Sequence, residues 1–205
     1  CDSSNVWLPE DYIVKSSKEV ELNKFAGMDC YVGVDLAATS DLTAVAYLVV
    51  LDGTYYFKTH YYLPESALKD KADKELYKYW KQQGYLTVTS GNVTDYDYIT
   101  ADMLRYADVV NIQSVGYDKY NATQWAIDST EQGLPLEEYP QTLGNFNMPT
   151  RELERLILSG KAVIDNNEIN RYCFRNVTLK SDYNGNVKPN KAVDKKKIDG
   201  TIAMI

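Results

Sequence analysis

The sequence is poor in the residues that build zinc sites and disulfide frameworks. Its 205 residues include three cysteines and one histidine. Cys1, Cys30 and Cys173 are odd in number and have none of the short spacings typical of zinc ligands. The cysteines therefore argue against a disulfide framework or a zinc site, and they fit a reducing compartment.

The chain also lacks long apolar runs and an excess of positive charge. No stretch approaches the roughly 20 apolar residues that cross a bilayer, so no membrane association is expected. The net charge of −7 is not the basic footprint of a generic nucleic-acid binder. An acidic total is nevertheless compatible with a site that gathers carboxylates around cations. Hydrophobic residues make up 44% of the chain, which is enough for the core of a globular domain.

The two ends of the sequence suggest a piece of a longer polypeptide. The start has no initiator methionine and no basic segment followed by an apolar one. The last residues, "KKKIDGTIAMI", stop within an amphipathic helical pattern. We therefore expect residues 1–29 to be a connecting arm and residues 30–205 to be one domain whose C-terminal helix is cut short.

The pattern from Tyr31 onward predicts the fold class. Two β-rich runs flank Asp52-Gly53, a strong hairpin signal, so three consecutive antiparallel strands are expected. Helical patterns then alternate with short strands, with helices over 64–84, 95–111, 121–133 and 150–160, an Asn/Gly hairpin and a last helix from Asp194. Thr150 is the expected cap of the fourth helix. The sequence predicts an α/β fold, a mixed sheet with helices on both faces, in a layout that resembles a ribonuclease H-like domain.

Two aspartates interrupt the apolar strand patterns at strand ends. Asp35 ends "YVGVD", and Asp118 ends "SVGYD". In α/β sheets functional groups gather where strand ends meet a change in strand order, so the two carboxylates are expected to emerge side by side. Two such groups would repel each other unless a cation lay between them. The pair therefore predicts a site for a hard divalent cation such as Mg²⁺ or Mn²⁺.

Asp199 is the expected third ligand. It lies in the predicted last helix, at the edge of the apolar stripe formed by Ile198, Ile202 and Ile205. Gly200 and Ala203 are small enough to let this helix approach the sheet closely. Two ions held by three carboxylates can activate a water and stabilise the leaving oxygen of a phosphodiester.

Three segments in this order, "YVGVDLAATSDLTAVAYL", "SVGYDKYNATQWAI" and "VTLKSDYNGNVKPNKAVDKKKIDGTIAMI", resemble the nuclease domain of tailed-phage terminase large subunits. The resemblance runs from about Tyr31 to Ile205. It implies a metal-dependent DNA endonuclease that cuts concatemeric viral DNA during genome packaging. The implied metal ligands are Asp35, Asp118 and Asp199.

The resemblance also implies partners and a location. An ATPase motor domain would precede this chain, which has no G-x-x-x-x-G-K-[ST] loop of its own. The expected partners are double-stranded DNA, a small terminase subunit and the capsid portal, and the expected location is the cytoplasm of the infected bacterial host.

Other polar residues have two interpretations each. Asp41 either braces the turn after Asp35 or binds a group that itself contacts the metal. Lys188 and Lys191 are either an ordinary solvated surface or a DNA-binding site for phosphate, and we favour phosphate for Lys191. His60 is expected to be structural.

Two rival functions remain open at this point. One is a nucleotide-phosphate-binding domain of the actin and sugar-kinase type, whose first hairpin also reads strand, aspartate, turn, strand; here the turn "LAATSD" has no glycine and an extra carboxylate. The other is a catalytically silent ribonuclease H-like domain that docks to other proteins, which the retained aspartates argue against.

Overall fold

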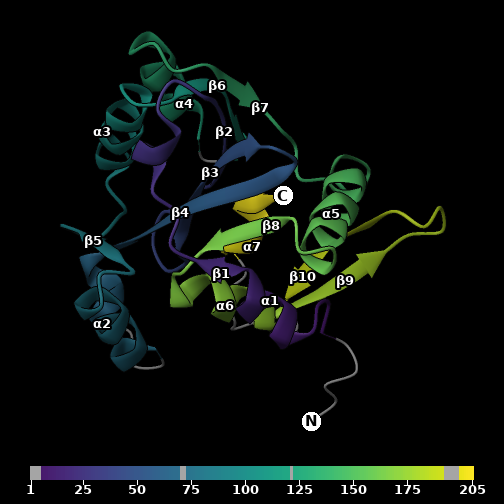
Figure 1. Ribbon diagram of the computed structural model, residues 1–205. Coiled ribbons are helices and arrows are strands. Elements are labelled where there is room, and N and C mark those ends of the chain that lie inside the picture. Colours follow the sequence, from purple (N-terminus) through teal and green to yellow (C-terminus); the bar gives the residue numbers. More distant parts are fainter. Residues whose placement is uncertain (1–5, 70–72, 121, 192–198) are drawn as a thin grey trace.

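The computed structural model describes residues 6–69, 73–120, 122–191 and 199–205, with only the backbone at 199, 201 and 202 (Figure 1). In chain order the described elements are α1 (Glu10–Ser16), β1 (Ser17–Lys18), a 3₁₀ turn (Leu22–Phe25), β2 (Asp29–Asp35), β3 (Thr43–Leu51), β4 (Thr54–Pro64), a second 3₁₀ turn (Glu65–Lys69), α2 (Lys74–Gln82), β5 (Thr87–Thr89), α3 (Tyr96–Ala107), β6 (Asn111–Tyr117), α4 (Thr123–Glu131), β7 (Leu136–Glu138), α5 (Leu143–Leu158), β8 (Ala162–Asp165), α6 (Glu168–Arg175), β9 (Val177–Ser181), β10 (Val187–Lys191) and α7 (Asp199–Met204).

A mixed sheet forms the centre of the molecule. In the described part of the chain it has eight strands in the order β1-β8-β4-β3-β2-β6-β7, with β5 beside the C-terminal end of β4. β2, β3 and β4 are antiparallel, whereas the pairs that β1, β5, β6, β7 and β8 make are parallel. The predicted α/β fold with a mixed sheet is confirmed.

The hairpin between β3 and β4 is the one that the sequence predicts. Leu51 pairs with Thr54, so Asp52 and Gly53 are the two turn residues. Both have positive φ, 51° and 77°, as a type I′ turn requires. This turn brings the two longest strands together, and β3 is buried along most of its length.

Helices cover both faces of the sheet, as predicted. The side chains of β3 alternate between the two layers. Ala44 and Ala46 belong to a core with residues of α5, α6 and α7, whereas Val45, Tyr47 and Val49 belong to a second core with residues of α3 and α4. Figure 1 shows α3 and α4 on one side of the sheet and α5, α6 and α7 on the other.

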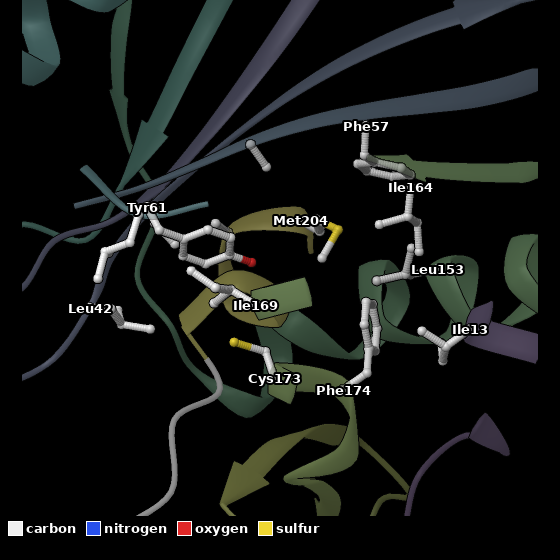
Figure 2. Packing of buried hydrophobic residues seen from close by; sticks show 14 of the residues in the cluster. Ile13, Leu42, Phe57, Tyr61, Leu153, Ile164, Ile169, Cys173, Phe174 and Met204 are labelled. Carbon is white, nitrogen blue, oxygen red and sulfur yellow. The ribbon is translucent and has the colours of Figure 1, made fainter. Parts of the chain in front are cut away.

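The packing beneath α7 matters most for the site. Figure 2 shows Tyr61 of β4, Met204 of α7 and Ile169 of α6 turned toward one shared interior. All three side chains are buried, and the exposed fraction of Tyr61 is 1%. α7 is therefore held between the sheet and α6.

The helix predicted over 95–111 ends earlier, at Ala107, because Asn111 begins β6, and two helix starts also differ from the prediction. The helix expected over 64–84 is wrong at its start, because Pro64 is the last residue of β4, where it pairs with Thr89 of β5, and a 3₁₀ turn follows. The cap predicted at Thr150 is also wrong. The helix starts at Leu143, and the side chain of Thr142 caps it by accepting a hydrogen bond from the Asn145 N–H.

Between Gly160 and the Asn/Gly hairpin the sequence predicts only a helix-like turn. The structure has a four-residue strand there, β8, which lies between β4 and β1, and a helix of two turns, α6. The predicted start of the last helix near Asp194 lies outside the described residues. The predicted Asn/Gly hairpin is confirmed as β9–β10, whose turn is held by the Asp182 carboxylate.

Residues 6–29 pack on the same domain. Trp7 donates a backbone hydrogen bond to Val177, and the side chains of Ile13 and Leu22 are buried. The role of this segment as an arm from a preceding domain stays a prediction. Within the described residues no helix is both long enough and apolar enough to span a membrane.

Candidate metal centre

Asp35 and Asp118 lie at the ends of two neighbouring parallel strands. β2 pairs with β6, and the register places Val34 beside Tyr117 at the end of the ladder. Asp35 is the next residue of β2, and Asp118 directly follows β6. Because neighbouring strands are about 5 Å apart, both residues leave the sheet side by side at the same end. The prediction that the two strands are neighbours is confirmed.

Both aspartates belong to the side of the sheet that α7 covers. Side chains two residues apart in a strand point to the same face, so Asp35 shares the face of Gly33. A Cβ atom at Gly33 would collide with the carbonyl oxygen of Ala203, so the α7 backbone lies directly on this face. Gly116 is the partner of Gly33, and it lines the same groove as Asp118.

The N-terminal end of α7 rests on the row of residues that contains Asp35. Asp35 pairs with Ala44 of β3, which pairs with Tyr61 of β4. A Cβ atom at Gly200 would collide with the Tyr61 hydroxyl, so the predicted close approach through small residues is confirmed. Asp199 begins the helix one residue earlier. Its side chain lies outside the described part of the chain, and its role as third ligand stays a prediction.

The Asp118 carboxylate is held by two backbone N–H groups. Oδ1 accepts a hydrogen bond from Tyr120 at 3.0 Å, and Oδ2 accepts one from Gln141 at 3.1 Å. A carboxylate has about four lone-pair sites, so each oxygen keeps capacity for another partner. The two bonds orient the group from two different loops and leave it able to bind a cation.

A groove of about 320 Å³ runs along the same face of the sheet. Its lining includes Asp118 and a second acid, Glu137 of β7, which pairs with Gly116 and is exposed. The remaining lining is mostly apolar or aromatic, including Tyr31, Tyr139 and Met204. Sequence reasoning missed Glu137, although the alternation in "LPLEEYP" places every second residue on one face.

The carboxylate oxygens of Asp35 and Asp118 are of the kind that a hard divalent cation prefers. Mg²⁺ and Mn²⁺ prefer oxygen ligands and retain waters where the protein supplies few. Over the residues that the structure describes, no three His, Cys, Asp or Glu side chains are placed to hold a metal ion together. Asp35 and Asp118 stay the predicted ligands of such a cation, and Asp199 is the expected source of a third carboxylate.

The other predicted residues lie at three different places. Asp41 lies in the connection from β2 to β3, whose turn Thr43 closes by bonding both polar backbone groups of Ala37. Lys188 lies in β10, and its amino group donates to the Gln141 carbonyl at 2.8 Å. Lys191 ends β10 three residues later and, by strand alternation, projects from the opposite face of the hairpin.

His60 lies on the other face of the sheet. It pairs with Val45, which is buried in the layer of α3 and α4. Its Nε2 atom is 2.6 Å from the Tyr106 hydroxyl. Burial, with the positive charges of Lys58 and Arg105, lowers the pKa of His60 from 6.5 to about 4. A neutral imidazole in this position favours the predicted structural role.

The family follows from comparison with known proteins. A family model described as "Terminase large subunit, endonuclease domain" matches residues 3–205. The chain belongs to this family. The resemblance seen in the sequence is confirmed, and the sheet with its helices is the ribonuclease H-like fold that was predicted.

Two individual relatives match most of this chain. The terminase large subunit of Enterobacteria phage HK97 is 30% identical over 182 residues, which cover 85% of this chain and 36% of that protein. Protein YmfN of Escherichia coli strain K12 is 32% identical over 206 residues, which cover 92% of this chain and 44% of that protein. This chain therefore spans less than half the length of either relative.

Solved terminase structures share the fold. The crystal structure of the HK97 large terminase matches with a TM-score of 0.85 and 26% identity over 96% of this chain and 42% of that one. The large terminase nuclease of thermophilic phage G20c with bound magnesium matches with a TM-score of 0.56 and 13% identity, over 86% of this chain and 78% of that one. At that identity the G20c match supports the fold alone.

Proposed function

We propose that this domain is a metal-dependent endonuclease that hydrolyses phosphodiester bonds of double-stranded DNA. The observation that carries the proposal is the placement of Asp35 and Asp118 at adjacent strand ends under α7, in a terminase endonuclease domain. The G20c nuclease, which shares the fold, has been solved with magnesium and with cobalt. These divalent ions match the oxygen donors present here.

The residues of this chain supply the ligands and their orientation. Asp35 and Asp118 hold the cations, and Asp199 joins them from the first residue of α7. Two bound ions would supply an activated water and would stabilise the leaving 3′ oxygen. Asp41 holds a metal-bound group in place or braces its turn. Lys191 and Lys188 are the proposed contacts to DNA phosphates.

The biological setting follows from the family. We place this domain behind an ATPase domain in a terminase large subunit that cuts concatemeric viral DNA during packaging. Its partners would be a small terminase subunit and the capsid portal, in the cytoplasm of the infected host. Residues 1–29 would form the connection to the ATPase domain.

A plasmid-nicking assay with Mg²⁺ and with Mn²⁺ tests the activity. The wild type should cut, whereas Asp35→Asn and Asp118→Asn should reduce cutting to background, because an amide is a neutral and weaker ligand. Asp97→Asn is the matched control, since Asp97 is exposed in α3 on the opposite face of the sheet and should cut like the wild type.

Other outcomes would favour the rival functions. A folded wild type that cuts with neither metal would support a silent docking domain. Nucleotide binding in calorimetry without DNA cutting would support a phosphate-binding domain of the actin and sugar-kinase type. Equal cutting by the wild type and Asp118→Asn would remove Asp118 from the mechanism.

A further inference from the structure

One residue, Gln141, links Lys188 to Asp118. The Gln141 N–H donates to Oδ2 of Asp118 at 3.1 Å, and the Gln141 carbonyl accepts from Nζ of Lys188 at 2.8 Å. Lys188 follows Gln141 by 47 residues. It belongs to the two-stranded sheet of β9 and β10, not to the central sheet. A cation on the hairpin is thus joined through one backbone residue to the carboxylate of the proposed metal centre.

The segment around Gln141 connects two elements of the domain. Gln141 lies between β7 and α5, outside both elements. The residues on either side have backbone bonds of their own, because Tyr139 donates to the Tyr117 carbonyl at 2.6 Å and Thr142 donates to the Pro140 carbonyl at 2.9 Å. The bond from Lys188 ties Gln141 itself to a more distant element, and a charged donor makes it stronger than a neutral hydrogen bond.

The strand that carries Lys188 is itself fixed to α5. Nη2 of Arg151 donates to the Gly185 carbonyl at 2.7 Å, and Oδ1 of Asn147 accepts from the Val187 N–H at 3.0 Å. Val187 is buried and directly precedes Lys188. The base of the lysine side chain therefore has a defined position relative to the loop that it restrains.

Lys188 differs from the lysine opposite it in burial and in the contact of its amino group. Lys180 of β9 is the cross-strand partner of Lys188. Lys180 is exposed, whereas Lys188 is half-buried with its amino group on a carbonyl. The link to Asp118 therefore belongs to Lys188 rather than to Lys180, and it leaves two of the three N–H donors of Lys188 for a DNA phosphate.

We infer that Lys188 is a positioning residue of the proposed endonuclease, which holds the Asp118 carboxylate through Gln141 in the orientation that receives a divalent cation. The inference rests on the proposed function, because it assigns Asp118 to a metal. Groups that orient a metal ligand typically change metal affinity by about 10- to 100-fold when removed. Lys188 reaches Asp118 through one further residue, so Lys188→Met should weaken Mn²⁺ binding by up to about 10-fold, the lower end of this range, without DNA present.

The test measures free Mn²⁺ by electron paramagnetic resonance in solutions of the purified protein without DNA. The variants are Lys188→Met, Lys188→Arg and Lys180→Met. We expect Lys188→Met to weaken binding, Lys188→Arg to restore most of it because arginine can also donate to the Gln141 carbonyl, and Lys180→Met to bind like the wild type. Thermal unfolding of each variant reports whether the fold is retained.

Plasmid cutting adds a second readout. At saturating DNA the kcat of Lys188→Met should be low at limiting Mn²⁺ and should recover as Mn²⁺ is raised. A lysine that only attracts DNA would raise KM for the plasmid and leave the Mn²⁺ dependence unchanged. Equal Mn²⁺ affinity in the wild type and Lys188→Met, or equal weakening by Lys188→Met and Lys180→Met, would overturn the inference.

Two further variants separate the possible failures. Asp118→Asn should abolish most Mn²⁺ binding, and a folded wild type that binds no Mn²⁺ would defeat the proposed function rather than the role of Lys188. Should Lys188→Met fail to fold, Lys188→Leu replaces it, because its side chain has no donor for the Gln141 carbonyl. Wild-type Mn²⁺ affinity in Lys188→Leu would then overturn the inference.

Discussion

At the scale of single residues, the candidate site depends on a glycine as much as on its acids. Gly33 stands two residues before Asp35, and the carbonyl oxygen of Ala203 occupies the space that a Cβ atom would need. Backbone atoms on both sides leave little room to adjust. Glycine at this position is what lets α7, and with it Asp199, lie close to the strand that ends in Asp35.

Gly33→Ala should therefore displace α7. We expect it to lower the free energy of unfolding by about 1–3 kcal/mol, as inserting a methyl into a packed core usually does, and to weaken Mn²⁺ binding. Urea unfolding and a Mn²⁺ titration measure the two effects. Gly144→Ala is the control, because its Cβ would meet only ordinary contacts in α5 and should leave stability equal or raise it by up to about 1 kcal/mol.

His60 makes a prediction about pH. Its pKa is about 4 in the folded protein because burial disfavours the imidazolium, so the folded state stays neutral while the unfolded chain gains a proton below pH 6.5. Between pH 6.5 and 4 the unfolded state binds more protons, and stability falls as the pH falls.

The matched variant is His60→Gln, which cannot titrate. From pH 7 to pH 5 the wild type should lose up to about 2 kcal/mol more unfolding free energy than His60→Gln, measured by urea unfolding at both values. Equal losses would mean that His60 does not carry this pH dependence.

The sequence alone identified the two candidate ligands that lie at the ends of recognisable strands. Asp35 and Asp118 interrupt apolar runs, so they could be found without knowing the fold. Glu137 and the contact of Lys188 could not, because they depend on how β7 pairs with β6 and on where the hairpin docks. The alternation in "LPLEEYP" groups Glu137 with Tyr139, but only the pairing of β7 with β6 shows that this face lines the groove.

At the scale of elements, a proline inside α5 explains why the start of this helix was predicted at Thr150 and not at Leu143. A proline inside a helix lacks an N–H and usually breaks or kinks it, which favours a start after Pro149, at the predicted cap Thr150. Pro149 instead lies inside α5, where it has no N–H for the carbonyl of Asn145 four residues earlier. The Tyr139 hydroxyl donates to that carbonyl. A partner from outside the helix thus compensates for the proline.

This compensation can be tested with a double-mutant cycle. Tyr139→Phe should lower the unfolding free energy by about 1 kcal/mol, because it removes the hydrogen bond to the Asn145 carbonyl. In a Pro149→Ala background the loss should be smaller, since the substituted alanine supplies the helical N–H that proline lacks. Urea unfolding of the four proteins gives the coupling, and equal losses in both backgrounds would contradict the explanation.

At the scale of the whole molecule, the sheet order brings the proposed site together. The central strands were predictable, because the Asp52-Gly53 turn and the alternation of β3 are local signals. The outer pairing of β1 with β8, and of β8 with β4, joins residues 17–18 to residues 162–165. Strands of two and four residues carry too little pattern for such a pairing to be predicted from sequence.

The account as a whole depends on one cation position, shared by Asp35 and Asp118 beneath α7. Crystals soaked in Mn²⁺ and measured at the manganese absorption edge test it most directly. We predict an anomalous peak about 2 Å from carboxylate oxygens of both Asp35 and Asp118, which is the usual distance for such ligands. Full occupancy elsewhere on the protein, with no peak between these two residues, would contradict the account.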